Sequence, residues 1–385
     1  MTVPKLIVEG WRFLAHSYAI VNQWQCLSLL RRSDVTLAIR DLPYYMAHWP
    51  QVHGLFPAEA DAALKALPMA AEGEEGDATL RLSFPLDYTL AGERTWVFGT
   101  SELKDIAPNA VKGGLDMLRQ CQAGVITPSQ WSKQGFMIAG IEERRIAVIP
   151  HGADPVIFRP DDALREEARQ RFNLTGFTFI SVGAMITNKG MDLLLKAFAA
   201  VLERYPDCQL ILKGNDALYP SKDFLSRTFA TLPAGAQSKV LARLIYMGGT
   251  VSMADMATLY RSADAYVSPY RAEGFNMPVL EAASCGLPII CTAGGSTDDF
   301  TDPSFTLHVS AQPVQMSYED RVVSMLEPDL EHLTAQMIRA IEDEAWRRQA
   351  HEASAAFVRA GFTWDHVADM LMKTVFLRPG EPLAL

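Results

Sequence analysis

Two acidic residues, Glu273 and Glu281, flank a proline in the stretch from Ala265 to Phe300. The stretch predicts a strand, a loop carrying Glu273, a helix carrying Glu281 and a second strand. Pro278 suits the first helical position, because that position has no N–H partner to lose and requires the φ that proline already has. Free amides and the dipole at such a helix end attract anions. Two carboxylates beside it suit hydroxyl groups next to a phosphate, which describes a sugar nucleotide better than a nucleic acid.

Lys189 is a second candidate, because it stands just before a predicted helix from Met191 to Arg204. A cation at a helix N-terminus opposes the helix dipole, which costs about 0.3 to 1 kcal/mol when the charge is exposed. The arrangement becomes favourable when an anion lies between the lysine and the helix. The sequence therefore indicates an anion site at this turn as well.

Length and charge limit the classes of function. A chain of 385 residues is expected to form two or more domains. Its 35 basic and 45 acidic residues give a net charge of −10, which argues against nucleic acid or anionic lipid as the main partner. With 49% apolar and 21% charged residues, the composition is that of an ordinary globular protein.

The cysteines and the N-terminal residues bear on the compartment. The five cysteines are widely spaced, include no C-x-x-C pair and are odd in number, so they favour a reducing compartment over disulfides or structural zinc. The N-terminal residues MTVPKLIVEGWRF hold too short an apolar run for a signal peptide, and no run approaches the roughly 20 apolar residues of a membrane helix. We therefore expect a cytoplasmic protein without a transmembrane segment.

Strands and helices alternate along both halves of the chain. Residues 5–9, 18–31 and 35–39 predict a strand, a helix and a strand, which is a βαβ unit. Ligands bind at the carboxyl ends of parallel strands, so the loop from Gly10 to Ser17 is a candidate site. Further strands are expected at 96–98, 124–127, 146–149, 177–182, 209–213 and 244–247. The alternation predicts an α/β protein whose second half restarts the pattern of the first.

The run EGFNMP from Glu273 to Pro278, then Glu281 and CGLP from Cys285 to Pro288, resembles a known signature. It is similar to the E-x7-E motif of retaining glycosyltransferases with the GT-B fold, above all those of family 4. Both acids, the glycine, the proline and the C-G-x-P run fall in register, which makes the pattern specific. The resemblance is strong from about Gly124 to Phe300, weaker before, and returns at the C-terminal helix.

This resemblance implies two Rossmann-like domains that face each other across a cleft. Residues 1–154 would form the acceptor-binding domain and residues 155–362 the nucleotide-sugar-binding domain. Residues 363–385 would form a C-terminal helix that crosses back to the first domain. Pro155 and Pro160 support a linker at the first boundary.

The resemblance also assigns roles to the candidate residues. Lys189 would bind the donor diphosphate and stabilise the charge that develops on it, and Glu273 would accept hydrogen bonds from hydroxyls of the donor sugar. Backbone amides of the loop and helix end would bind diphosphate and sugar, Glu281 would hold the ribose, and the turn after residues 244–247 would hold the base. The donor-binding residues implied in this way are Gly274, Phe275, Asn276, Met277, Glu281, Gly249 and Val251.

A histidine of the first domain often contacts the donor sugar in such enzymes. His16 is the candidate because it lies in the loop after the first strand, with His48 and His53 as alternatives and a purely structural histidine as the commoner case. The chain holds no D-x-D motif, so Lys189 and a helix N-terminus would neutralise the diphosphate without a metal ion, and no other cofactor is implied.

One position departs from the family pattern. An arginine commonly follows the glycine of the strand before Lys189 and serves as a second phosphate ligand, but this chain has Ala184 there. Either another basic residue compensates, with Arg12 and Arg271 as candidates, or phosphate binding is weaker.

The resemblance therefore implies a retaining, metal-independent hexosyltransferase that moves a sugar from a nucleotide-sugar donor to an acceptor hydroxyl, by default in glycan or polysaccharide biosynthesis. Two alternatives stay open. One is a catalytically silent sugar-nucleotide-binding partner protein, which the missing arginine favours. The other is a sugar-nucleotide epimerase of the same fold. The base, the sugar, the acceptor and the oligomeric state cannot be read from the sequence.

Overall fold

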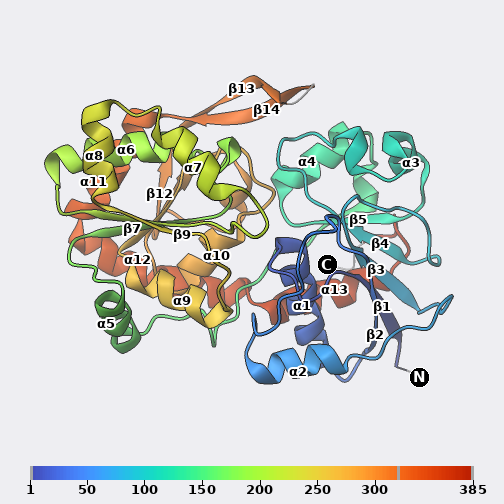
Figure 1. Ribbon diagram of the computed structural model, residues 1–385. Helices are drawn as coiled ribbons and strands as arrows, with labels where there is room; N and C mark the ends of the chain where they lie inside the picture. The colour runs from blue at the N-terminus through green and yellow to red at the C-terminus, as the bar shows by residue number, and fades with distance from the viewer. Residues whose placement is uncertain (1–2, 319–320, 383–385) are drawn as a thin grey trace. The chain divides into compact units, whose positions relative to one another are not determined.

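The computed structural model describes residues 3–318 and 321–382. The chain divides into two compact units, of which the first joins Met1–Gly152 to Phe362–Leu385 and the second is Ala153–Gly361 (Figure 1). Each unit is built around its own parallel β-sheet. The expected α/β architecture with two Rossmann-like units is therefore confirmed.

The first unit has a six-stranded parallel sheet in the order β2-β1-β3-β4-β5-β6. Its strands are β1 (Lys5–Gly10), β2 (Thr36–Asp41), β3 (Ala78–Leu82), β4 (Thr95–Phe98), β5 (Gly124–Thr127) and β6 (Ile146–Val148). Strand β3 was not predicted, because Arg81 interrupts its short apolar run. The structure buries this guanidinium against the neighbouring strand, where Arg81 Nε donates to Glu9 Oε2 at 2.6 Å.

Helices cover both faces of this sheet, as its buried strands require. Trp96 of β4 donates its indole N–H to the carbonyl of Leu377 beyond the last helix, at 3.2 Å, whereas Val97 packs in a cluster with Leu118 and Phe136. Helices α1 and α13 therefore lie on one face, and α3 and α4 lie on the other (Figure 1). The helices are α1 (Ser17–Leu30), α2 (Ala58–Ala66), α3 (Gly114–Gln120), α4 (Gln130–Ile138) and α13 (Trp364–Val375), with short 3-10 turns η1 (Pro108–Ala110) and η2 (Glu143–Arg145).

The last helix, α13, packs on the first helix of the same unit. Trp364 at the start of α13 stacks on Trp24 of α1, with ring centroids 6.1 Å apart. Arg31, just after α1, pairs with Asp365. These contacts explain why the residues from Phe362 onward group with the first unit.

The second unit has a six-stranded parallel sheet in the order β12-β11-β10-β7-β8-β9. Its strands are β7 (Thr178–Val182), β8 (Gln209–Lys213), β9 (Leu244–Met247), β10 (Ala265–Ser268), β11 (Ile289–Thr292) and β12 (Thr306–Val309). The chain proceeds from β7 to one edge of the sheet, returns to β10, and then proceeds to the other edge. In such open sheets, ligands bind outside the carboxyl ends of the strands at the point where the order reverses. Here that point lies between β7 and β10.

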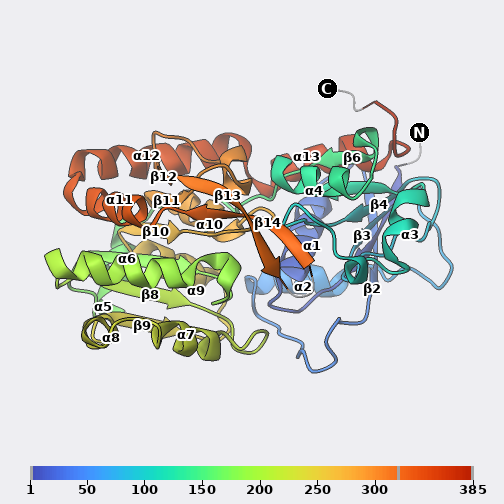
Figure 2. The same ribbon diagram turned by 90° about the horizontal axis from the view of Figure 1, so that it is seen from above.

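The helices of the second unit also form two layers. Helices α6, α7, α8 and α11 cover one face of the sheet, and α5, α9, α10 and α12 cover the other (Figures 1 and 2). The helices are α5 (Asp162–Arg171), α6 (Met191–Arg204), α7 (Ser221–Phe229), α8 (Ala234–Leu241), α9 (Met253–Ser262), α10 (Met277–Ser284), α11 (Leu330–Glu342) and α12 (Glu344–Gly361), with 3-10 turns η3 (Thr187–Lys189) and η4 (Ser296–Asp299). Helix α6 shows why these helices pack on the sheet, because Leu194, Phe198 and Val201 recur at helical spacing and are fully buried.

Local chemistry fixes where many of these helices begin. A side-chain oxygen at the N-cap accepts the backbone N–H three residues ahead, which satisfies one of the otherwise unpaired donors of the first turn. This cap is formed by Ser129, Asp161, Ser252, Asp329 and Thr363.

An antiparallel hairpin, β13 (Ala311–Tyr318) and β14 (Arg321–Pro328), follows β12 and was not predicted. Figure 2 shows that it extends away from the parallel sheet of its own unit. In β14, Val323 and Met325 are buried two residues apart, as in a half-buried strand, and the next buried side chain is the adjacent Leu326. Glu327, near the base of the hairpin, contacts Arg271 in the loop that carries Glu273.

Within residues 3–318 and 321–382, every helix is either too short or too polar to cross a lipid bilayer.

Candidate active site

Lys189 and Glu273 meet where the strand order of the second unit reverses. Strand β7 leads into η3, which ends at Lys189, and β10 leads into the loop that carries Glu273. Lys189 Nζ lies 2.6 Å from Glu273 Oε1, and the two side chains are 18% and 10% exposed. The structure thus joins two of the predicted site residues in one largely buried ion pair.

The backbone holds these two segments against each other. The N–H groups of Arg271 and of the next residue donate to the carbonyl of Asn188, at 2.7 and 3.2 Å. Gly190 has a φ of +67°, and a Cβ at this position would overlap the carbonyl oxygen of Pro269. Only glycine permits this approach, so Gly190 sets the spacing between η3 and the end of β10.

Arg271 uses all five of its N–H donors inside the protein. Nε and Nη2 bind the Glu327 carboxylate at 2.6 and 2.9 Å, and Nη1 and Nη2 bind the Asp192 carboxylate at 2.6 and 2.9 Å. Nη1 also donates to the carbonyl of Thr187 at 3.1 Å. The side chain, 6% exposed, therefore ties α6, η3 and the hairpin to the loop of Glu273. It has no donor left for a phosphate.

Arg12, the other candidate to replace the missing arginine, is likewise held by the protein. It lies in the first unit, where Nε and Nη2 bind the two carboxylate oxygens of Asp41 at 2.7 and 2.6 Å. Its Nη1 donates to the carbonyl of Leu64. Both arginines that sequence reasoning offered for the role of Ala184 are thus held by protein carboxylates in this structure.

Helix α10 begins at Met277, one residue earlier than predicted, so Pro278 occupies its second position. The argument for the helix end is unchanged, because a backbone N–H has no partner inside the helix at either of the first two positions, so proline loses no hydrogen bond at the second. Gly274, Phe275, Asn276 and Met277 form the turn that enters this helix. Their backbone stands at the positive end of the helix dipole, which favours an anion there.

Asn276 gives this turn its shape. It has φ +78° and ψ +62°, in the left-handed region that asparagine adopts more readily than most residues. Its side-chain amide donates to Ser268 Oγ at 2.9 Å, at the end of β10. The preceding Phe275 stacks on Phe300, with ring centroids 4.4 Å apart. The turn is therefore fixed on both sides by contacts within the second unit.

Glu281 lies one turn into α10, and its Oε2 accepts a hydrogen bond from the hydroxyl of Tyr260 at 2.8 Å. Burial raises the pKa of Glu281 to about 7, even though the hydrogen bond from Tyr260 lowers it. A carboxyl group with this pKa is partly ionised at neutral pH. In its ionised form it can accept a further hydrogen bond, such as one from a ribose hydroxyl.

Gly249 and Val251 lie in the turn after β9. Gly249 is exposed, with open space where a Cβ would stand, and Val251 is half-buried. Strand β9 is two strands away from β7, a separation of about 10 Å in a sheet. The predicted base-binding turn therefore lies along the same carboxyl edge as Lys189.

His16 lies in the first unit, in the loop after β1, and caps α1. Its Nδ1 accepts the backbone N–H of Tyr18 at 3.2 Å, and its ring centroid lies 5.4 Å from that of Trp11. Burial lowers the pKa of His16 to about 4, so the ring is neutral at pH 7 and, with Nδ1 as an acceptor, carries its proton on Nε2. In this tautomer the ring has a single N–H donor, at Nε2. The alternatives His48 and His53 are exposed in the segment between β2 and α2.

Two residues of this region were missed by sequence reasoning. Tyr260 has the spacing of an ordinary core residue on α9, and nothing in that pattern indicates its contact with Glu281. Lys213 closes the apolar strand β8 (QLILK) and is buried. A charged residue at the carboxyl end of an otherwise apolar strand is the signal that identifies it.

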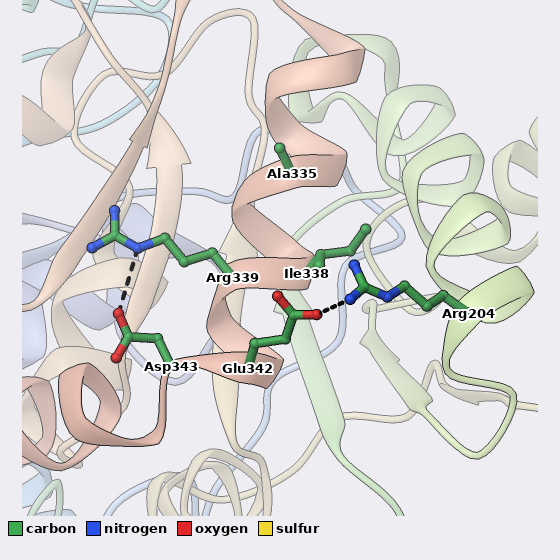
Figure 3. Close-up of a pocket in the computed structure, with 6 residues that line it drawn as sticks. All are labelled: Arg204, Ala335, Ile338, Arg339, Glu342 and Asp343. Atoms are coloured by element: carbon green, nitrogen blue, oxygen red, sulfur yellow. Dashed lines mark ion pairs between the residues drawn. The ribbon is translucent and has the colours of Figure 1, made fainter.

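A hollow of about 560 Å³ lies between α6 and α11, away from this region (Figure 3). Arg204 on its rim ends α6, whereas Lys189 precedes that helix, and 14 residues of helix extend about 21 Å. The charges of the hollow pair with each other, Arg204 with Glu342 and Arg339 with Asp343. The hollow is therefore separate from the candidate site.

Among the described residues, no group of three or more His, Cys, Asp or Glu side chains is arranged to hold a metal ion.

Comparison with known sequences identifies one family model and several relatives. Residues 163–353, which include Lys189, Glu273 and Glu281, match the family model described as Glycosyl transferases group 1. Mannosylfructose-phosphate synthase of Agrobacterium fabrum is 30% identical over 246 residues, which cover 63% of this chain and 50% of that protein. D-inositol 3-phosphate glycosyltransferase 1 of Catenulispora acidiphila is 26% identical over 273 residues, which cover 69% and 59%. The chain thus spans about half the length of the curated relatives it matches.

Solved structures share the fold over nearly the whole chain. The crystal structure of Anabaena Alr3699/HepE in complex with UDP and glucose has a TM-score of 0.71 at 14% identity, covering 97% of this chain and 99% of that chain. Sucrose-phosphate synthase from Thermosynechococcus elongatus has a TM-score of 0.65 at 19% identity, covering 96% and 97%. The chain thus has the GT-B fold, and residues 163–353 are similar to the glycosyl transferases group 1 family.

Proposed function

We propose that this chain is a retaining glycosyltransferase of family 4, with the E-x7-E motif formed by Glu273 and Glu281. It transfers a hexose from a nucleotide-sugar donor to an acceptor hydroxyl, in glycan or polysaccharide biosynthesis. The bond between C1 of the sugar and the diphosphate oxygen breaks, and the acceptor oxygen joins C1 on the same face. The proton of the acceptor hydroxyl passes to the leaving diphosphate.

The observation that carries this proposal is the ion pair between Lys189 and Glu273, which stands beside the N-terminus of α10. Lys189 and the helix amides supply positive charge where the leaving diphosphate gains negative charge. Glu273 supplies a carboxylate for the sugar hydroxyls and for the positive charge that grows on the sugar ring. The UDP and glucose of the Alr3699/HepE structure support a nucleotide-sugar donor for this fold.

The remaining residues take the roles that the resemblance implies. Glu281 accepts from the ribose, and Gly249 and Val251 line the base. The turn from Gly274 to Met277 binds diphosphate and sugar through its backbone. His16 donates its Nε2–H to a hydroxyl of the donor sugar, in keeping with its neutral ring.

The two parts of the chain have different main substrates. Residues 1–154 bind the acceptor and contribute His16 to the donor sugar, residues 155–362 bind the donor, and residues 363–385 return to the first domain. Lys189 and α10 supply positive charge for the diphosphate, so we propose transfer without a metal ion, in the cytoplasm.

A catalytically silent sugar-nucleotide-binding protein is the second candidate. Arg271 and Arg12 are held by protein carboxylates, so neither replaces the arginine absent at Ala184. A weakly held leaving group slows transfer more than it weakens the binding of the rest of the nucleotide. Turnover therefore separates the two candidates, whereas binding alone does not.

The first step of the test is a panel of nucleotide sugars assayed by thermal shift. A bound donor stabilises the protein by RT ln(1 + [L]/Kd), about 2.7 kcal/mol at a hundredfold excess over Kd. Release of free sugar or transfer to added acceptors is then followed for the donor that binds. We expect turnover that Glu273→Gln and Lys189→Met reduce by about 10²-fold or more, and that the exposed-lysine control Lys239→Met leaves unchanged.

The outcomes decide between the candidates. Binding without turnover in the parent protein favours the silent binder. No stabilisation by any nucleotide sugar contradicts both candidates.

A further inference from the structure

Lys213 is a buried cation at the carboxyl end of β8. Its neighbours in register are Val182 of β7 and Met247 of β9, so it stands level with the strand ends from which the turn of Lys189 and the turn of Gly249 depart. The residue is 5% exposed. A lysine usually extends along the surface and keeps its ammonium group in water, and this one does not.

No carboxylate among the described residues forms an ion pair with Lys213. Its ammonium group donates to the carbonyl of Gly214, its own neighbour in the chain. Asp216 is close enough to raise the pKa of Lys213, but its Oδ1 is bound by the hydroxyl of Tyr246 at 2.7 Å and the backbone N–H of Lys222 at 3.0 Å. Burial outweighs the effect of Asp216 and lowers the pKa of Lys213 to about 8.

A buried ammonium group without a paired charge destabilises a fold, because it has lost its hydration and gained no counterion. The rest of the strand, QLILK, shows that apolar side chains suit the interior of this sheet. Lys189 differs, since Glu273 balances its charge. A cation that the fold leaves unbalanced at the ligand-binding edge of a sheet is instead balanced by an anionic ligand.

We propose that Lys213 binds an anionic oxygen of the donor diphosphate and supplies the second positive charge that neither Arg271 nor Arg12 provides. This inference rests on the proposed function, since it requires a nucleotide donor at the edge formed by β7, β8 and β9. Lys213, at the end of β8, would then contact the leaving diphosphate beside Lys189, which follows β7.

The test compares the intact chain with Lys213→Met, which keeps the length of the side chain and removes the charge. Lys239→Met, at an exposed position of the same unit, is the matched control. UDP, GDP and ADP are titrated calorimetrically against the parent protein, and the diphosphate that binds most tightly is taken forward. Its nucleoside, without phosphate, is measured by competition. We expect Lys213→Met to weaken the diphosphate by about tenfold or more, as for loss of a charge-assisted hydrogen bond, and to leave the nucleoside unchanged.

A second measurement separates a ligand contact from a structural role. The melting temperature of ligand-free Lys213→Met is expected to equal or exceed that of the parent protein, because an unbalanced buried charge has been removed. Equal weakening of nucleoside and diphosphate, an unchanged Kd for the diphosphate, or a lower melting temperature each overturns the inference. If no diphosphate binds the parent protein, the proposed function fails first, so the two failures are distinguishable.

Discussion

Lys189 Nζ and Glu273 Oε1 lie 2.6 Å apart, although the two residues follow strands on opposite sides of the point where the strand order reverses. Each charge is held in place by the other in the absence of ligand. Under the proposed function, a donor diphosphate at Lys189 and the Glu273 carboxylate compete for the same ammonium group, so binding of the phosphate would be coupled to the position of Glu273.

Removal of either member takes the ion-pair partner away from a largely buried charge. We expect Lys189→Met and Glu273→Gln each to lower the free energy of unfolding by about 1 to 3 kcal/mol. The double variant is expected to lose clearly less than the sum of the two single losses. Urea denaturation of the four proteins measures this coupling. Strict additivity would show that the two charges do not stabilise each other.

Glu281 predicts a pH dependence of donor binding. Its pKa is raised to about 7 in the folded protein without ligand, so the ionised fraction rises about tenfold between pH 6 and pH 8. A ribose hydroxyl donates to the ionised form, so affinity for a nucleotide sugar, whose diphosphate does not titrate in this range, is expected to rise by up to about tenfold. Titration calorimetry at pH 6 and pH 8 measures this change in affinity.

Two variants control for other titrating groups. Glu281→Gln should abolish the rise in affinity, and a fall that remains toward pH 8 is expected from Lys213, whose pKa is about 8. Tyr260→Phe removes the hydrogen bond that lowers the pKa of Glu281, so it should move the midpoint of the affinity change to higher pH. A rise in donor affinity with pH that persists in Glu281→Gln would show that another group is responsible.

The raised pKa of Glu281 also makes a prediction for stability. The folded-state pKa lies above the unfolded value of 4.5, so the folded protein binds the proton more tightly, and stability from this group falls as pH rises from about 4.5 to about 7.

Arg271 is expected to be intolerant even of lysine. A lysine keeps the charge but cannot reproduce the two bidentate contacts with Asp192 and Glu327. We expect Arg271→Lys to cost about 3 to 5 kcal/mol in the free energy of unfolding, the range for a broken buried ion pair. The matched control is Arg243→Lys, whose partner Asp207 is 84% exposed, with an expected cost below about 1 kcal/mol. Similar losses at both positions would contradict the structural role of Arg271.

Gly190 predicts a steric effect on activity. An alanine there is strained by the φ of +67° and overlaps the carbonyl of Pro269, so Gly190→Ala has to displace η3 from the end of β10. We expect a loss of about 1 to 3 kcal/mol in stability and a fall in turnover, because Lys189 is the adjacent residue. Gly235→Ala, in helix α8 with open space at the Cβ position, should be neutral or slightly stabilising. Unchanged turnover in Gly190→Ala would show that the spacing of the two segments does not matter.

The sequence indicated the fold and the two halves of the ion pair, because local signals carry both. Most strands of the two sheets are short apolar runs between turns, and Glu273 and Lys189 stand beside predicted helix starts. Strand β3 was not predicted, because the charge of its Arg81 is balanced by Glu9, 72 residues away in the sequence. The structural role of Arg271 was not predicted for the same reason, because its partners Asp192 and Glu327 lie 79 and 56 residues away in the sequence. Partners so distant along the chain leave no local pattern, so an arginine that closes an internal network looks the same in sequence as one that binds a ligand.

Asn276 has a consequence for how the site discriminates among ligands. Its left-handed backbone conformation is held by Ser268 on one side and by the stacked Phe275 on the other, with no ligand involved. The turn is thus preorganised, and a ligand does not have to supply the free energy of ordering it. If the turn binds an anionic group as proposed, it acts as a rigid template, and a molecule whose anionic group is displaced from the helix axis gains little.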